Sequence, residues 1–276
     1  MRYSRSLLWT QCSIEIHESD FFLWDIETSF RIISDFEETY SRFLHDNYLA
    51  KLNQQKSAIC NSELKLLINF WKKLWDISQG YFDITVLPYL ENNWYGVSDT
   101  ILKEDIWYQN IEIKDTQITL HNNVCVEFWA YGKGYLLDKV WHYLSQKYTN
   151  FTLNFWGDIK VYGTKEIYLE NPGKKDMYYG KIQVQDSSLT SSNGSKRVFW
   201  DAMHHLIDIK SWKSHNKVHT VFCYHKKSIF ADGFATLLSV TPKELSKKIM
   251  KNISWLEAFV IYSDGSVLKS WRFTDI

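Results

Sequence analysis

The segment from residue 230 to residue 238 reads Phe230-Ala231-Asp232-Gly233-Phe234-Ala235-Thr236-Leu237-Leu238, and its apolar residues predict a short helix over about 230–239. In a helix, Asp232 and Thr236 are four residues apart and lie on one face. A carboxylate and a hydroxyl on one face offer the oxygen ligands that Mg²⁺ prefers. The spacing alone favours a simpler interpretation, in which Asp232 caps a helix and Thr236 bonds back to a carbonyl.

The chain on either side of this segment predicts strands and helices in blocks. A strand is expected at 217–224 before it, and a helix at 242–251 after it. A final hairpin of 257–262 and 266–272 turns at Ser263-Asp264-Gly265.

The N-terminal half adds elements of both kinds. Apolar residues at helical spacing predict a helix over about 22–43, and a second helix has Ser62 as its expected N-cap and Gly80 just past its end. Residues 111–128 alternate like a hairpin around Asp115-Thr116. A helix at about 133–147 and strands at 151–155, 159–162, 166–170 and 179–184 follow. Because helices and strands do not alternate strictly, the pattern favours an α+β fold of antiparallel sheets with flanking helices.

Length and composition exclude several classes of protein. The 276 residues suit a single domain over 1–276, built as one body or as two closely packed lobes. The 32 basic and 32 acidic side chains cancel, so no overall field draws in nucleic acid or a membrane surface. No apolar run approaches the ~18 residues of a membrane span. The N-terminus lacks the features of a secretory signal, so we expect a cytoplasmic protein unless an export leader has been removed.

Two further features of composition leave the function open. Aromatic residues make up 17% of the chain, including 13 Trp, which fits either large core side chains or stacking platforms for a planar ligand. The cysteines Cys12, Cys60, Cys125 and Cys223 lie too far apart for a zinc pattern. We therefore expect thiols in a reducing compartment.

Two short motifs could contact phosphate. In Ala130-Tyr131-Gly132-Lys133-Gly134-Tyr135, glycines flank a lysine at a strand-to-helix junction, which lets amides and an ammonium approach an anion. A tight turn with a solvated lysine explains the same residues, and the P-loop spacing is absent. The polar stretch Thr190-Ser191-Ser192-Asn193-Gly194 is expected to be a loop that holds phosphate oxygens or an ordinary turn.

Two other motifs carry titratable groups. The stretch from Asp201 to Asp208 holds His204 and His205, one of which could act as a general base or be a partly buried histidine with a backbone partner. The stretch Gly80-Tyr81-Phe82-Asp83-Ile84-Thr85 places an acid among aromatic residues, where it could bind a planar base or cap a loop.

The order of these motifs is more specific than any one of them. Taken together over about residues 8 to 272, they make the chain resemble the ApbE family, the FAD:protein FMN transferases. The matching segments are Ser41-Arg42-Phe43, Leu52-Asn53, Gly80 to Pro88, Glu127-Phe128, Lys133 to Asp138, Gly157-Asp158-Ile159, Glu170-Asn171-Pro172, Thr190-Ser191, His205 to Asp208, and Ala231-Asp232 to Ala235-Thr236.

The resemblance implies an activity and the residues for it. It implies a Mg²⁺-dependent flavin transferase that moves FMN from FAD to a threonine or serine hydroxyl of a target flavoprotein and releases AMP. It implies a metal held by Asp232, Thr236 and the carbonyl of Ala130, with His205 near the transferred phosphoryl group as the candidate base. It also implies that the FAD site is lined by Phe43, Tyr81, Phe82, Asp83, Glu127, Lys133, Thr190 and Leu206.

Several family glycines are replaced in this chain. The family's Met-Gly-Thr reads Leu8-Trp9-Thr10, its Gly-Gly-Asp-Ile reads Trp156-Gly157-Asp158-Ile159, and its Thr-Ser-Gly reads Thr190-Ser191-Ser192. Each lost glycine alters a local backbone constraint. The alternatives to a transferase are therefore an FAD pyrophosphatase, an FAD-binding relative without catalysis, and an unrelated aromatic-rich binding module.

Overall fold

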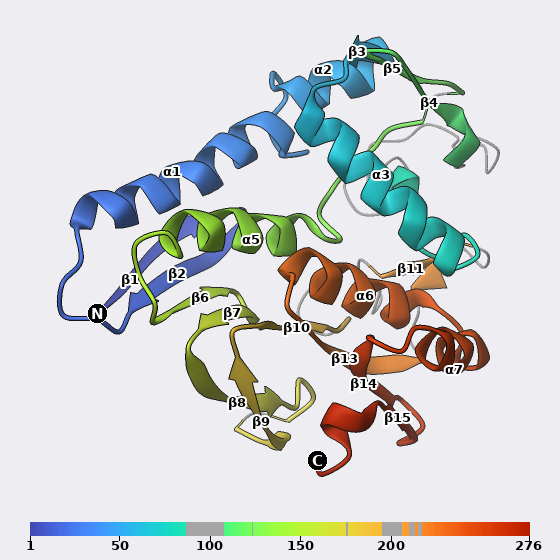
Figure 1. Ribbon diagram of the computed structural model, residues 1–276. Helices are drawn as coiled ribbons and strands as arrows, with labels where there is room; N and C mark the ends of the chain where they lie inside the picture. The colour runs from blue at the N-terminus through green and yellow to red at the C-terminus, as the bar shows by residue number, and fades with distance from the viewer. Residues whose placement is uncertain (87–107, 123, 175, 195–205, 210–212, 215–216) are drawn as a thin grey trace.

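The computed structural model describes residues 1–86, 108–122, 124–174, 176–194, 206–209, 213–214 and 217–276. Its main feature is a large sheet in which every neighbouring pair of strands is antiparallel (Figure 1). In order across the sheet, the described strands are β1 (Arg2–Leu7), β2 (Thr10–Ile16), β6 (Phe151–Phe155), β7 (Asp158–Tyr162), β10 (Ser188–Ser192), β13 (Val218–His225), β14 (Glu257–Tyr262) and β15 (Val267–Lys269).

The central strands of this sheet are buried on both faces. In β14, Ala258 and Val260 belong to the core under the helices, whereas Phe259 and Ile261 belong to a second core on the opposite face. This follows from the period of two in a strand, which points successive side chains to opposite faces. The sheet therefore separates two layers.

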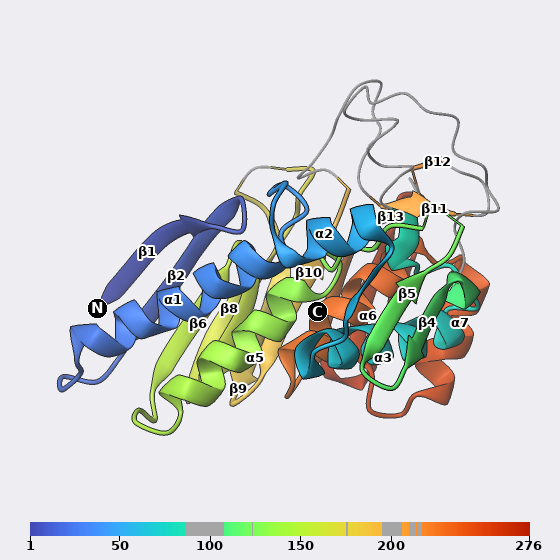
Figure 2. The same cartoon turned by 90° about the horizontal axis from the view of Figure 1, so that it is seen from above.

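Three helices cover one face of the sheet: α1 (Leu23–Tyr40), α5 (Gly132–Leu144) and α6 (Ser228–Val240) (Figures 1 and 2). In α1, Ile26, Phe30 and Ile33 recur at helical spacing and are buried. The other face is covered by the hairpin of β8 (Thr164–Glu170) and β9 (Tyr178–Gln185), together with a 3₁₀ turn at Trp271–Phe273.

The remaining elements lie beside the helical layer. They are α2 (Tyr48–Gln55), α3 (Ser62–Ile77), α7 (Lys243–Asn252), a small sheet in the order β3 (Ser57–Ile59), β5 (Gln117–Leu120) and β4 (Ile111–Lys114), the pair β11 (Ile207–Asp208) and β12 (Lys213–Ser214), and 3₁₀ turns at Ile84–Val86 and Tyr108–Asn110. Within the described part of the chain, no helix has the length and apolar character needed to cross a membrane. The expectation of one domain with two lobes stays a prediction.

The structure confirms the α+β architecture and corrects several boundaries. The N-cap of α3 is Asn61, whose side chain accepts a 2.7 Å hydrogen bond from the Leu64 amide, so Ser62 is the first helical residue and not the cap. Gly80 has a φ of +82°, as a glycine past a helix end requires. The hairpin predicted over 111–128 ends at Leu120, and residues 188–192 form a central strand where the sequence predicted a loop from residue 190.

Candidate active site

A pocket of about 450 Å³ opens where α5 and α6 approach the ends of the large sheet. Ten of the residues expected at the site line this pocket, although they come from all parts of the chain. They are Phe43, Tyr81, Phe82, Asp83, Glu127, Ala130, Lys133, Leu206, Asp232 and Thr236. The size and the mixture of apolar walls with a few polar groups suit a small-molecule site.

One edge of the pocket carries three oxygen-bearing groups. The Thr236 hydroxyl donates a 3.0 Å hydrogen bond to the carbonyl of Ala130, which brings these two oxygens together. Asp232 lies one turn before Thr236 on α6 and lines the same pocket. A carboxylate, a hydroxyl and a carbonyl are hard ligands of the kind that bind Mg²⁺.

Asp232 is held by the neighbouring helix. Its Oδ2 accepts a 2.8 Å hydrogen bond from the Gly134 amide in the first turn of α5, where the helix dipole favours an anion. Burial, followed by the charge of Asp158, raises the pKa of Asp232 to about 8, although Lys133 and the Gly134 amide oppose this rise. Among the described residues, none donates a hydrogen bond to Oδ1 of Asp232. This oxygen is therefore available to a ligand in the pocket.

Lys133 brings a positive charge to the same region. Its ammonium pairs with the carboxylate of Asp158 at the start of β7, and the side chains are 15% and 1% exposed. Asp158 also accepts a 3.3 Å hydrogen bond from the Ser191 amide on β10. Asp158 thus fixes the lysine on the pocket wall and links α5 to the sheet.

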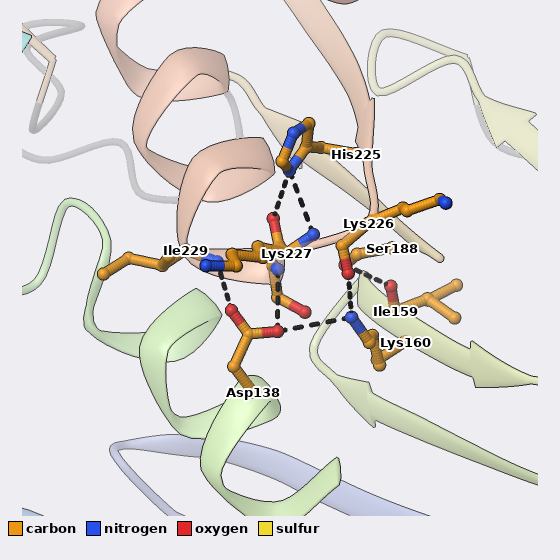
Figure 3. Close-up of polar contacts among 9 residues, drawn as sticks. Asp138, Ile159, Lys160, Ser188, His225, Lys226, Lys227 and Ile229 are labelled. Carbon is orange, nitrogen blue, oxygen red and sulfur yellow. Dashed lines mark hydrogen bonds and ion pairs between the residues drawn. The ribbon is translucent and has the colours of Figure 1, made fainter. Parts of the chain in front are cut away.

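The position of α6 is set by a carboxylate on α5. Asp138 accepts hydrogen bonds from the amides of Ser228 at 2.8 Å and Ile229 at 3.0 Å, which are the first two residues of α6 (Figure 3). These amides have no partner within the helix, so Asp138 serves as the N-cap that the local sequence lacks. The buried ammonium of Lys160 lies 3.3 Å from the same carboxylate and also donates to the carbonyl of Lys226. Burial lowers the pKa of Lys160, and Asp138 opposes this.

Two acidic side chains in the pocket wall accept hydrogen bonds from neighbouring residues. Asp83 accepts hydrogen bonds from the Trp75 indole at 3.0 Å and from the amide and hydroxyl of Thr85 at 2.9 and 2.7 Å. Burial raises the pKa of Asp83 to about 6 against these bonds. Glu127 accepts a 2.7 Å bond from the Trp129 amide. Both side chains therefore order the backbone that forms the wall.

The ordered set of motifs and this geometry agree with the comparison to known proteins. The model of the ApbE family matches residues 8–260. The chain belongs to the ApbE family. No match was found among curated proteins.

In the described residues, no cluster of three or more histidine, cysteine, aspartate or glutamate side chains suitable for a metal is present.

Solved structures named ApbE share the fold. The ApbE protein of Thermotoga maritima superposes with a TM-score of 0.88 at 19% identity, over 99% of this chain and 97% of that one. The flavin transferase ApbE of Vibrio cholerae gives 0.85 at 18% identity, over 100% and 98%. The apo flavinyl transferase ApbE of Pseudomonas stutzeri gives 0.83 at 14% identity, over 100% and 96%.

Two expected site residues are not found in the pocket wall. Thr190 is fully buried on β10 and borders a neighbouring cavity of about 350 Å³, whereas Ser191, Ser192 and Asn193 after it line the main pocket. His205 lies outside the described residues, and so does His204.

Several residues that line this pocket were not among those expected from the sequence. The pocket is also lined by Trp9, Arg42, Trp129, Trp156, Val240 and the backbone neighbours Ile207 and Ile209. The motif Gly157-Asp158-Ile159 was a usable signal for Asp158, since it matches the family pattern. Trp9 and Trp156 were noted only as replacements of family glycines.

Proposed function

We propose that this protein is a Mg²⁺-dependent transferase that moves FMN from FAD to a threonine or serine hydroxyl of a target flavoprotein and releases AMP. The observation that carries the proposal is the convergence of Ala130, Asp232 and Thr236 at one edge of a pocket that is also lined by several aromatic side chains. Membership of the ApbE family supports it, as does the structural similarity to the flavin transferase of Vibrio cholerae and the flavinyl transferase of Pseudomonas stutzeri.

The ligand set of the pocket fits magnesium. Among the described residues, the carboxyl groups of Asp158 and Asp232 are buried near the ammonium of Lys133, and burial and the charge of Asp158 raise the pKa of Asp232. A cation in the pocket would favour the ionised form of Asp232. The available Oδ1 of Asp232, the Thr236 hydroxyl and the Ala130 carbonyl would hold the ion. When bound there, Mg²⁺ would neutralise charge on the pyrophosphate oxygens.

The other polar groups of the pocket would bind and orient the pyrophosphate. Lys133 lies in the first turn of α5, so its ammonium and the positive end of the helix act on the same anion. Ser191, Ser192 and Asn193 line the wall beyond β10, where small polar groups can donate to phosphate oxygens. Tyr81, Phe82 and Phe43 offer apolar rings to the two planar ends of FAD.

The reaction requires one bond to form and one to break. The acceptor hydroxyl oxygen attacks the phosphorus on the FMN side of the pyrophosphate, and the bond from that phosphorus to the AMP oxygen breaks. The hydroxyl proton passes to a base, for which His205 remains our candidate. AMP leaves, and FMN stays attached to the acceptor through a phosphoester. Positioning and charge stabilisation supply most of the catalysis in such transfers.

A transfer assay tests the proposal directly. Purified protein is incubated with FAD, Mg²⁺ and a flavin acceptor domain, and the acceptor is then examined for covalent flavin fluorescence in a denaturing gel while released AMP is quantified. We expect both products in equal amounts. AMP and FMN without a labelled acceptor would instead show an FAD pyrophosphatase. FAD binding without AMP would show a non-catalytic relative, and an absence of flavin binding would favour an unrelated binding module.

A further inference from the structure

Two hairpin turns at the pocket place tryptophan where the backbone disfavours it. Trp9, in the β1–β2 turn, has a φ of +53°, and Trp156, in the β6–β7 turn, has a φ of +57°. A left-handed backbone is unfavourable for residues with a Cβ and is normally left to glycine, asparagine or aspartate. These are also the positions at which the family pattern has glycine. The tryptophans at both positions therefore carry a local conformational cost.

Core packing does not explain why tryptophan stands at these turns. The Trp9 side chain is 70% exposed and Trp156 is 39% exposed, so each leaves a large apolar area in contact with water. Both residues nevertheless line the main pocket. A strained, exposed aromatic residue at a pocket mouth indicates a role in contacting something that enters the pocket.

The two turns lie side by side. The Trp156 amide donates a 3.2 Å hydrogen bond to the Gln11 carbonyl, which joins the turns at one end of the sheet. The β1–β2 turn lies beside the loop between α1 and α2 (Figure 2), and the Trp9 ring centre is 4.8 Å from that of Phe43. Phe43 in turn meets Trp129 edge-to-face at 5.8 Å. We call Trp9, Phe43, Trp129 and Trp156 the aromatic rim.

We propose that Trp9 and Trp156 of the aromatic rim stack on the isoalloxazine ring of FAD and hold it at the pocket mouth. This inference rests on the proposed function. Of the two planar ends of FAD, the tricyclic isoalloxazine presents the larger apolar surface, and its electron-poor ring system attracts an electron-rich indole. Stacked aromatic pairs contribute beyond the area they bury. In this chain, two indoles thus add flavin contacts at positions where the family pattern has no side chain.

The test uses glycine variants, because glycine suits the left-handed turns. Trp9→Gly and Trp156→Gly are each titrated with FMN, FAD and ADP in the presence of Mg²⁺, and the fluorescence of bound flavin is recorded. An indole in contact quenches excited flavin by electron transfer. We expect each variant to bind FMN and FAD about tenfold more weakly, which is ~1.4 kcal/mol, and to leave the bound flavin brighter. The affinity for ADP should stay within about twofold, and the thermal unfolding midpoint should not fall, since glycine relieves the backbone strain.

A control and three outcomes complete the test. Trp271 is 79% exposed and does not line the pocket, so Trp271→Ala should bind and quench flavin as the parent protein does. Unchanged affinity and quenching in both glycine variants, with flavin transfer intact, would overturn the proposed stacking of Trp9 and Trp156 on the flavin. The proposed function would then still stand. Weaker binding of ADP but not FMN would overturn it in favour of an adenine site. A parent protein that binds no flavin would overturn the proposed function itself.

Discussion

Asp232 on α6 accepts a 2.8 Å hydrogen bond from the amide of Gly134 on α5, and Asp138 on α5 accepts two from the first amides of α6. The two helices therefore cap one another through carboxylates that are far away in the sequence. Asp232 does cap a helix, as the simpler interpretation of its spacing predicted. The capped helix is α5, however, and not α6, on which Asp232 lies. The same contact presents Asp232 to the pocket, so a structural role and a proposed metal ligand coincide in one side chain.

Gly134→Ala should disrupt this contact. An added Cβ at residue 134 would lie 2.4 Å from the Ser228 carbonyl oxygen and 2.6 Å from Cβ of Asp232, so the helices must separate. We expect a loss of unfolding free energy of about 1–3 kcal/mol, as for overpacked sites. Urea unfolding measures the loss. Gly132→Ala is the matched control, because its Cβ would meet only the Phe36 ring at 3.7 Å. Equal stability of the two variants would contradict the close contact.

Removing the Asp138 carboxylate should also destabilise the protein. Asp138→Ala leaves two amides of α6 without their cap and the buried Lys160 without its acidic partner. We expect a loss of at least about 2 kcal/mol in urea unfolding. The double variant Asp138→Ala with Lys160→Met should recover part of the loss, because it removes the uncompensated charge. No recovery would show that the cap alone accounts for the effect.

The stability should depend on the ionisation of Asp25. Burial raises the pKa of Asp25, but hydrogen bonds from Lys147, Tyr143 and Tyr148 together lower it below its ordinary value. A lowered folded pKa stabilises the fold above the ordinary pKa of 3.8, and this contribution disappears as the pH falls through the folded value. Asp25→Asn should therefore cost about 2 kcal/mol at pH 7. Urea unfolding from pH 7 towards pH 2 should show the difference shrinking, and a constant difference would contradict the ionised network.

The sequence predicts those elements best whose signal is local. The helices at 22–43 and 133–147 and the C-terminal hairpin were found because their apolar residues recur at a fixed period. β1 and β2 were missed, since β1 is an exposed edge strand and β2 pairs with β6, whose residues lie far along the chain. The loop predicted from residue 190 is a strand because β13 pairs with Thr190, Ser191 and Ser192, and this pairing supplies hydrogen bonds that local propensity does not register.

The candidate site could likewise be predicted from the sequence only in part. The order of the motifs predicted ten residues that the structure places in the wall of one pocket. The spacing of Asp232 and Thr236 alone favoured a helix cap. Contacts that depend on tertiary structure were not predictable, among them the pairing of Lys133 with Asp158 and the cap from Asp138. The left-handed backbone of Trp9 and Trp156 was also hidden, since only the fold shows that a tryptophan there contacts the pocket.

The most direct test of the proposed function is the Mg²⁺ dependence of flavin transfer in Asp232→Ala. The variant is compared with the parent protein and with Asp46→Ala, a control whose side chain is 93% exposed and does not line the pocket. Covalent flavin on the acceptor and released AMP are measured across a Mg²⁺ titration, after unfolding has shown that each variant is folded. We predict that Asp232→Ala loses at least about 100-fold of the Mg²⁺-dependent rate, while Asp46→Ala keeps it. Parent-like transfer and an unchanged Mg²⁺ requirement in Asp232→Ala would contradict the account.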